Sequence, residues 1–382
     1  MLFRYGRPPL SEDALLASAN FTLSLLPARL ASRIQALQNL PFIVVSNPSV
    51  SKIYRNYLHS LSTLLPYHQR KITTLEEENQ FGDVLADLVQ THTNTIPVLA
   101  QGFLESRKYV SPDYVTRFLD THLRARIGTR LMAEQHLALR FTSQLDSEQP
   151  SNSTTPSNYI GVIDTTLKPA QIVRLCEDFV GEICELKYGV RPRLEISGET
   201  EASFAHIPVH LEYIITELLK NAFRATIESG NEQEPIQVTI AAAPDMHKRH
   251  VQDVDYLESH LKPKVDPSLT NDDIFNPSSQ SITIRIRDRG GGIPPEVFPN
   301  IWSYAFTTFS DMDVQSSENN NLDALNTFSN SGGNLSSIAG LGYGLPLSRA
   351  YAEFFGGGIA IQNMVGWGTD VYLTLRGVGK ID

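Results

Sequence analysis

Apolar residues recur at steps of three and four positions from Ser11 to about Phe141, and this helical spacing restricts the fold more than any other feature. In the stretch from Asp113 to Leu139 the apolar stripe consists of Val115, Phe118, Leu119, Leu123, Ile127, Leu131 and Leu137. Amphipathic helices must bury such stripes against one another. We therefore predict that residues 1–146 form an all-α domain, a bundle of about four helices.

The periodicity stops in residues 147–158, which are rich in Ser, Asn, Pro and Thr and which we interpret as a linker. Beyond them, helical patterns at 168–188 and 208–228 alternate with strand-like runs at 193–196, 236–241, 281–287, 359–362 and 369–375. Short connections favour antiparallel pairing of much of this sheet. The sequence predicts an α+β chain, in which residues 159–382 form an α/β sandwich with helices on one face of a mixed, largely antiparallel sheet.

Two long irregular segments interrupt the second half of the chain. Structureless connections longer than about 15 residues are uncommon inside compact domains. Residues 244–280 are polar and contain several prolines, so we interpret them as a surface insertion. Residues 310–333 are rich in Asn, Ser and Asp and lead into a glycine cluster, which favours a lid over a ligand.

Charge and cysteine content exclude several classes of protein. Lys and Arg total 32 against 42 Asp and Glu, and the net charge of −10 argues against general nucleic-acid binding. No uninterrupted apolar run reaches the roughly 20 residues that span a bilayer, so we expect no membrane segment. Cys176 and Cys184 would lie about 12 Å apart on one helix, too far for a disulfide, which favours a reducing compartment.

Four polar residues share one face of the predicted helix 208–228. Glu217, Lys220, Asn221 and Arg224 stand at positions i, i+3, i+4 and i+7. A magnesium phosphate site needs a base, a hard oxygen ligand and positive charge for the phosphates, and these side chains supply all three. A solvated helix face with ordinary ion pairs explains the same pattern, and for this helix alone it is the better explanation.

Two glycine clusters are candidate nucleotide-binding elements. The first follows the predicted strand 281–287, and the second follows the predicted lid. Asp288 ends a strand just before Gly290 and Gly292, where a carboxylate can accept a hydrogen bond from a base amine, although an Asp that caps its own turn fits equally well. Residues 340–344 precede a helical run, and glycine amides at a helix N-terminus form a phosphate cradle. The GxGxG spacing, without a Walker lysine or the usual kinase signatures, excludes a dinucleotide fingerprint, a P-loop and an ordinary protein kinase.

The order of these three boxes resembles the ATPase superfamily of gyrase, heat-shock chaperone, mismatch-repair and histidine-kinase ATP domains. Within it, "ELLKNAFRAT", "DRGGGIP", "GLGYGLPLSRAYAEFFGG" and "GWGTDVYLTLR" are similar to the mitochondrial 2-oxoacid dehydrogenase kinases. Upstream, "NPSVSKIYRNYLHSL", "IPVLAQGFLESRKYV" and "RIGTRLMAEQHLAL" are similar to the helical regulatory domain of that family. Some strings favour its branched-chain members and others its pyruvate members, so the sequence does not choose between them.

The resemblance implies roles for individual residues. Glu217 matches the proposed general base, Asn221 matches the magnesium ligand, and Asp288 matches the adenine-binding aspartate. ATP is then the co-substrate with Mg²⁺, and some family members also hold K⁺ by carbonyls near the position of Phe306. The other positions that match nucleotide contacts are Arg224, Gly290, Gly292, Thr307, Thr308, Gly340, Leu341, Gly342, Tyr343, Gly344, Leu345 and Thr369.

The resemblance also implies a regulatory site in the bundle. His92 matches a histidine of the family's 2-oxoacid pocket, and Arg126 and Arg130 lie four positions apart on one predicted helix. Two guanidinium groups can bind a carboxylate, while plain structural ion pairing explains them nearly as well.

Two other positions concern the chemistry. Tyr213 stands where the pyruvate dehydrogenase kinases have a histidine, one turn before the base. This difference argues against a histidine–glutamate dyad but not against the role of the glutamate. His136 lies where a histidine kinase could carry its phosphoacceptor, but no acid or nearby proline follows it. We therefore interpret His136 as a core or interface residue.

For the whole protein, the resemblance implies a serine protein kinase of the mitochondrial matrix that inactivates the E1 subunit of a pyruvate or branched-chain complex. It implies docking on E2 lipoyl domains and a homodimer, although we expect no dimerisation through a C-terminal tail because the chain stops at Asp382. We expect no nucleic acid or membrane partner. Two alternatives stay open, a histidine-kinase-like phosphotransferase and a weakly catalytic ATP-dependent scaffold.

Overall fold

The computed structural model describes residues 5–148, 158–243, 280–304 and 342–378. The chain divides into two compact units. The first contains residues 1–164, 207–218 and 293–354, and the second contains 165–206, 219–292 and 355–382. Most of the predicted linker, nearly all of the 244–280 insertion and the whole 310–333 lid lie outside the described residues. The domain limits at 146 and 159 stay a prediction.

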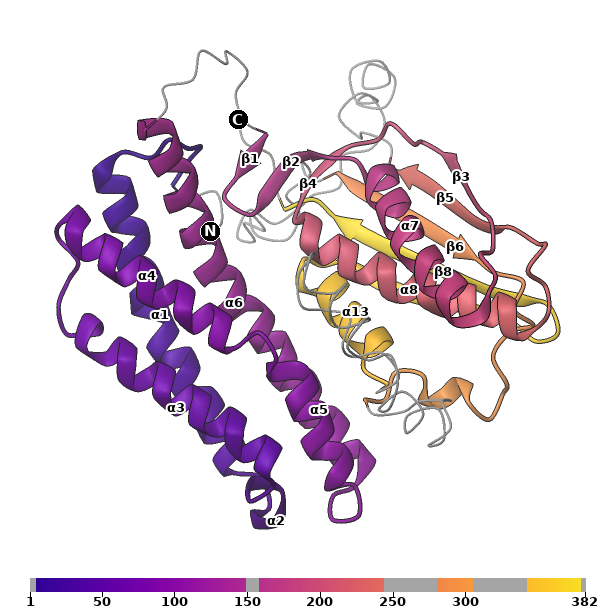
Figure 1. Cartoon of the computed structure of the whole chain (residues 1–382), viewed down its shortest axis with the longest axis horizontal. Coiled ribbons are helices and arrows are strands. Elements are labelled where there is room, and N and C mark those ends of the chain that lie inside the picture. The colour runs from indigo at the N-terminus through magenta and orange to yellow at the C-terminus, as the bar shows by residue number, and fades with distance from the viewer. Residues whose placement is uncertain (1–4, 149–157, 244–279, 305–341, 379–382) are drawn as a thin grey trace, which may run out of the picture. The chain divides into compact units, whose positions relative to one another are not determined.

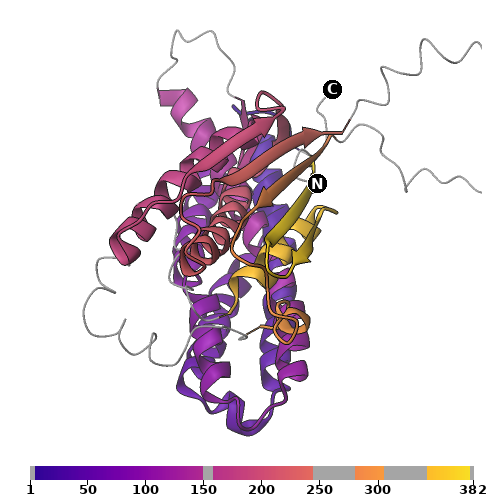
Figure 2. The same ribbon diagram turned by 90° about the vertical axis from the view of Figure 1, so that its right-hand side faces the viewer.

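The helical part of the first unit confirms the predicted all-α region, for which the sequence predicts about four long helices. Within residues 5–148 five helices have eleven residues or more, and a short one joins the first two of them. They are α1 (Glu12–Gln38), α2 (Phe42–Val45), α3 (Pro48–His68), α4 (Leu75–Thr91), α5 (Thr95–Glu105) and α6 (Pro112–Glu148). Helix α1 packs against α3, α4 and α6, and the long helices run side by side (Figures 1 and 2).

Side-chain caps explain where three of these helices begin. The hydroxyl of Ser11 accepts a hydrogen bond from the backbone N–H of Ala14, and Thr74 does the same for Glu77. The side chain of Asn47 accepts from the N–H groups of two residues, and Pro48 follows at the first helical position. Such caps satisfy amides that have no partner within the helix.

Among the described helices, α1 is long and apolar enough, by length and composition alone, to cross a membrane. Its buried side includes Leu23, Leu30 and Leu37, and it packs inside the bundle. A core helix passes the same test, so the observation has little weight.

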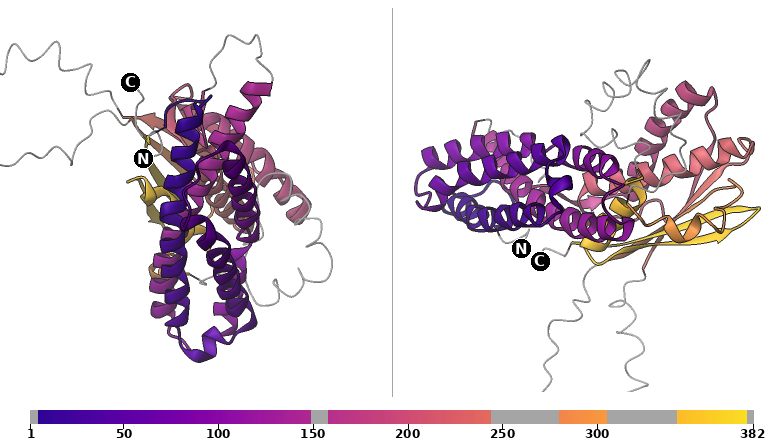
Figure 3. Two further views of the ribbon diagram at one scale, coloured as in Figure 1. Left: turned by 90° about the vertical axis from the view of Figure 1, so that its left-hand side faces the viewer. Right: turned by 90° about the horizontal axis from the view of Figure 1, so that it is seen from below.

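The second unit is built on a five-stranded sheet whose order is β3-β5-β6-β8-β7. Strands β3 and β5 are parallel, and every other pair is antiparallel. Helix α7 and the C-terminal half of α8 lie on one face (Figure 3), as predicted. The elements are α7 (Pro169–Tyr188), β3 (Leu194–Gly198), α8 (Pro208–Glu228), β5 (Ile236–Ala242), β6 (Ser281–Arg287), β7 (Gly358–Met364) and β8 (Gly368–Arg376).

Alternation along β6 shows how this sheet is packed. Ile282, Ile284 and Ile286 are at most 1% exposed, whereas the residues between them are only half-buried. A side-chain period of two places the isoleucines on the face that the helices cover. The two cysteines of α7, Cys176 and Cys184, are buried and are not joined in a disulfide, in agreement with the sequence analysis.

A second, small sheet was not predicted. Its three strands are β1 (Tyr159–Ile160), β2 (Ile163–Leu167) and β4 (Phe204–His206), in the order β1-β2-β4. Strands of two to five residues are too short to show a periodicity, so only tertiary pairing defines them.

Buried histidines make the stability of both units depend on pH. Burial is the main reason that the pKa of His122 is lowered to about 3 and that of His206 to about 4. An unfolded histidine titrates near 6.5, so between about pH 4 and 6.5 the unfolded chain binds more protons and stability rises with pH. We expect the melting temperature to fall steadily from pH 7 to pH 4.5.

A variant isolates the contribution of one histidine. His122→Phe should flatten the pH dependence by roughly 1–2 kcal/mol between pH 6.5 and pH 5, because that titration disappears. Thermal scans across this range measure the effect. If the melting temperatures of wild type and variant fall in parallel as the pH is lowered, His122 does not cause the pH dependence.

Candidate functional site

Glu217 lies in the middle of α8 with 7% of its surface exposed. Its carboxylate packs against Gly344, the first residue of α13 (Gly344–Phe354), and a Cβ atom at position 344 would collide with a carboxylate oxygen. A larger residue at position 344 would require the carboxylate of Glu217 to shift. The fold thus brings the predicted base together with the last glycine of the second cluster, although 127 positions separate them in the sequence.

A neutral phenol lies one helical turn before the predicted base. Tyr213 is 2% exposed, and its ring packs against that of Tyr351 on α13 with centroids 5.3 Å apart. Burial, followed by the charge of Glu217, raises the pKa of Tyr213 well above its ordinary value, so the hydroxyl keeps its proton. That hydroxyl has no hydrogen-bond partner among the described residues. At the position where a histidine would form a dyad with the glutamate, the chain therefore has a buried, neutral hydrogen-bond donor, the hydroxyl of Tyr213.

The two remaining nucleotide candidates of α8 follow in the next turns. Asn221 is exposed, so its amide oxygen is accessible to a ligand. Arg224 forms an ion pair with Glu228 within the same helix. The ion-pair interpretation of this helix face therefore holds for Arg224. A nucleotide-binding role of Arg224 stays a prediction.

Asp288 is held in a defined orientation at the end of β6. It is 6% exposed, and its Oδ1 atom accepts hydrogen bonds from the backbone N–H groups of Gly290 (2.8 Å) and Thr369 (3.2 Å). Its own backbone N–H donates to the carbonyl of Thr369 (3.0 Å). Burial raises the pKa of Asp288 despite the two hydrogen bonds. Asp288 therefore caps its own turn and is also locked to β8.

Glycines around Asp288 permit backbone contacts that side chains would block. A Cβ at Gly290 would collide with Ala225 of α8, and one at Gly368 would collide with the carbonyl of Asp288. Gly292 has φ +79° and lies against the carbonyl of Met364. These glycines therefore let the backbone that follows β6 pack closely against α8 and against the β7–β8 hairpin.

Sequence reasoning missed one part of this region. The guanidinium of Arg289 stacks over the ring of Trp367, 4.0 Å from its centroid, and Trp367 is 57% exposed. The string "GWGTD" was the available signal, but only the β7–β8 pairing brings it beside Asp288.

The second glycine cluster is described only in part. Gly342 has φ +73°, and Tyr343 is 1% exposed and packs on Tyr304 with ring centroids 5.4 Å apart. Leu345 lies in the first turn of α13. Gly340, Leu341, Phe306, Thr307 and Thr308 lie outside the described residues. Within the part that the structure describes, no group of three or more His, Cys, Asp or Glu residues could hold a metal.

The bundle brings His92 and Arg126 together. His92 shares a hydrogen bond with the hydroxyl of Ser60 (2.8 Å), and its ring stacks on Tyr57 with centroids 4.7 Å apart. Burial, followed by the charges of Arg126 and Arg130, lowers the pKa of His92 to about 4, so the imidazole is neutral at pH 7. Arg126 is 7% exposed and donates to the carbonyl of His92 (2.8 Å).

Arg130 and His136 have structural partners. Arg130 pairs with Glu134 one turn along α6, at 2.7 Å. His136 is 1% exposed, shares a hydrogen bond with Ser18 (3.1 Å), and lies 3.3 Å from a carboxylate oxygen of Glu78. His136 is therefore a residue of the core, as the sequence predicts.

Comparison with known proteins assigns the fold of the second half of the chain to a class of ATPases. A model of the histidine kinase-, DNA gyrase B- and HSP90-like ATPases matches residues 206–378. A model described as mitochondrial branched-chain alpha-ketoacid dehydrogenase kinase matches residues 1–164.

Curated relatives extend over the whole chain. The chain is 30% identical to pyruvate dehydrogenase (acetyl-transferring) kinase 1, mitochondrial, of Saccharomyces cerevisiae, over 99% of its own length and 83% of that protein. It is 29% identical to the corresponding kinase of Arabidopsis thaliana, over 99% and 89%, and 28% identical to kinase isozyme 4 of Rattus norvegicus, over 99% and 83%. The chain belongs to the mitochondrial 2-oxoacid dehydrogenase kinase family. It is a protein kinase that uses ATP.

Proposed function

We propose that this kinase transfers a phosphoryl group from ATP to a serine of the E1 subunit of a mitochondrial 2-oxoacid dehydrogenase complex and thereby inactivates it. The observation that carries the site assignment is the buried carboxylate of Glu217, fixed against Gly344 at the start of α13. The names of the curated relatives favour the pyruvate complex, whereas the name of the N-terminal family model favours the branched-chain complex. The matrix is the compartment where such a substrate occurs.

In this proposal Glu217 accepts the proton of the substrate hydroxyl as the phosphoryl group is transferred. Asp288, whose carboxylate is held by the N–H groups of Gly290 and Thr369, orients the adenine. Asn221 presents a hard amide oxygen of the kind that Mg²⁺ prefers, and the bound ion would neutralise phosphate charge. K⁺ near Phe306 stays part of the proposal, carried by the resemblance.

The purified chain with E1 of each complex and MgATP tests the proposal. We expect phosphoserine on one E1 and a parallel loss of dehydrogenase activity, which also identifies the complex. Phosphohistidine on the chain itself would support the histidine-kinase alternative. Nucleotide-dependent binding without phosphoryl transfer would support the scaffold alternative.

Asn221→Ala tests the metal site. The variant should bind ATP at least roughly tenfold more weakly when Mg²⁺ is present, because a water places the ion less well than the amide oxygen does. Calorimetry with ATP, with and without Mg²⁺, measures this effect. Affinity without the metal serves as the control and should not change. Equal affinity of both proteins for MgATP would remove Asn221 from the site.

Two partners complete the proposal, a second copy of the chain and the lipoyl domain of E2. Both rest on the resemblance to the family. Light scattering on the purified chain tests the homodimer, and pull-down with lipoylated and unlipoylated domain tests docking. A monomer, or equal capture of both domain forms, contradicts the respective part.

We further propose that His92 and Arg126 bind a small 2-oxo acid that regulates the kinase. Arg126 is buried, and Glu134, the carboxylate that acts on its pKa, is already paired with Arg130. A buried guanidinium that lacks its own counterion is costly, so an anion there is stabilising. The neutral imidazole of His92 adds polar contact without repelling the arginines.

The same unit contains a route from this cluster to the base. The charges of Arg126 and Arg130 act on Tyr351 of α13, and the ring of Tyr351 packs on Tyr213. Tyr213 lies one turn before Glu217, and α13 begins at the glycine that touches the carboxylate of Glu217. An anion that neutralises Arg126 therefore changes the electrostatic field at Tyr351 and at Tyr213, which lies beside the base. Coupling of about 1–3 kcal/mol is typical.

Arg126→Ala should abolish inhibition by the 2-oxo acid substrate of the complex while uninhibited turnover stays mostly intact. Inhibition curves for the two proteins measure this. Arg130→Ala is the matched control and should have the smaller effect, because Arg130 is already paired with Glu134. If the acid still inhibits the Arg126 variant and the melting temperature falls, Arg126 is structural and the sensor lies elsewhere.

A further inference from the structure

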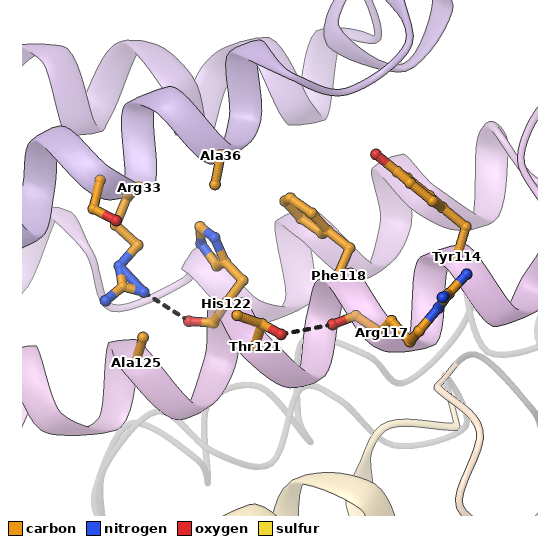
Figure 4. A pocket seen from close by; sticks show the side chains of 9 residues that line it. Arg33, Ala36, Tyr114, Arg117, Phe118, Thr121, His122 and Ala125 are labelled. Carbon is orange, nitrogen blue, oxygen red and sulfur yellow. Dashed lines mark hydrogen bonds between the residues drawn. The ribbon is translucent and has the colours of Figure 1, made fainter.

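A pocket of about 430 Å³ lies between α1 and α6 (Figure 4). Ligand sites usually measure roughly 300–1,000 Å³, so this volume suits a small organic molecule. None of the residues that the sequence assigned to a site lines it. The lining comes from α1 and from the first turns of α6, and the residues used below are Arg33, Ala36, Arg117, Phe118 and His122.

Arg33 is a buried cation, and no carboxylate within the described ranges forms an ion pair with it. It is 7% exposed, and its guanidinium donates to the carbonyl of His122 (3.0 Å) and the hydroxyl of Thr129 (3.4 Å), both of which are neutral. Burial lowers the pKa of Arg33; Tyr57 opposes this shift, whereas the charges of Arg29 and Arg126 add to it. Taking a cation out of water without a counterion is costly. An anion bound at this position would offset that cost.

His122 supplies an unused donor to the same pocket. It is 3% exposed, and its lowered pKa keeps it neutral at pH 7. Its Nε2 atom lies 3.2 Å from the hydroxyl of Tyr57, whose raised pKa keeps that proton available for donation. In the tautomer in which Tyr57 donates to Nε2, the ring proton of His122 is on Nδ1, which has no partner among the described residues. A buried polar atom of this kind calls for a ligand or a water.

The rest of the pocket is apolar or lies at its mouth. The ring of Phe118 stacks on His122 with centroids 5.5 Å apart, and Ala36 faces it from α1 (Figure 4). Arg117 is exposed, and the hydrogen bond recorded for its guanidinium goes to a backbone carbonyl of its own helix, at 3.4 Å. The surroundings thus suit a flat or branched apolar body that carries one negative group.

We propose that this pocket binds a monocarboxylate with an aromatic or branched aliphatic body, its carboxylate on Arg33 and His122 and its body on Phe118. A single charge matches the single buried guanidinium. The site is distinct from the His92 cluster because Tyr57 stands between them, stacked on His92 and hydrogen-bonded to His122. The two sites share this wall, and neither requires the other to be occupied.

Calorimetry with the full chain tests the proposal, with 3-phenylpropanoate as the probe. We expect saturable binding of one equivalent, and binding of the uncharged 3-phenylpropan-1-ol should be at least tenfold weaker. Arg33→Met should weaken binding of the acid at least tenfold. Arg29→Met, one turn earlier on α1, is the matched control and should stay within threefold of wild type, as should Arg126→Met.

Ala36→Phe keeps the test decisive if the Arg33 variant does not fold. This change fills the pocket without removing the buried charge, so the acid should no longer bind while the melting temperature stays near that of wild type. Three results would each overturn the proposal: no saturable binding, equal affinity for acid and alcohol, or displacement of the acid by inorganic phosphate at the same concentration. Loss of binding in the Arg126 variant alone would move the acid to the neighbouring site and also overturn it.

Discussion

Glu217→Gln should lower the turnover number roughly 10²- to 10⁴-fold and leave ATP affinity nearly unchanged. The amide has the size and shape of the carboxylate, but it cannot accept the proton of the substrate hydroxyl. Because the carboxylate packs against Gly344, the replacement enters the same space and does not disturb the start of α13. Steady-state kinetics with purified E1, together with calorimetry for ATP, measure the two quantities.

Glu212→Gln is the matched control for this experiment. Glu212 lies on the same helix and is only half-buried, so the change should leave turnover close to that of wild type. An unchanged turnover number for Glu217→Gln would refute the assignment of the base. A loss of ATP affinity with normal turnover would show instead that Glu217 organises the nucleotide.

Gly344→Ala should lower turnover by roughly 10²-fold, since a displacement of about 1 Å at a reacting group has effects of that size. The added methyl group would occupy the space of a carboxylate oxygen of Glu217 and push the base away from its position. Alanine favours a helix more than glycine does, so the melting temperature should not fall by much. The expected signature is lost activity in a folded protein.

Gly358→Ala is the control for the second experiment, because a Cβ at this position would meet no atom within 4 Å. Its turnover should equal that of wild type. If Gly344→Ala also keeps wild-type turnover, the carboxylate can move aside without cost and the contact does not position the base. If Gly344→Ala unfolds the chain, the contact is structural.

The sequence predicted the elements that bear the site better than it predicted their surroundings. The limits of α8 and β6 agree with the prediction at both ends, because each element has a strong period and an abrupt end. The sequence predicts about four long helices in the bundle, and residues 5–148 contain five, since α4 and α5 are separated only by the short turn from His92 to Asn94. The small sheet was missed because its strands are too short to show alternation.

In the candidate site, too, some residues were predicted from the sequence and others appeared only in the structure. Box order and residue type pointed to Glu217 and Asp288 from the sequence alone, whereas the stacking of Arg289 on Trp367 and the pocket around Arg33 did not appear in any pattern. Arg33 reads in the sequence as one more polar residue of an amphipathic helix. Only burial against α6 turns it into a cation that lacks a counterion.

The sequence by itself determined the helical and mixed halves of the chain, the family and the residue types of the nucleotide site, because periodicity and short motifs are local properties of a chain. The tertiary structure decided which distant residues touch: Glu217 with Gly344, Asp288 with Thr369, Arg126 with His92. Such contacts depend on strand register and on how helices pack. These are set by the sum of many weak burial terms across the whole fold, which no short segment of sequence contains.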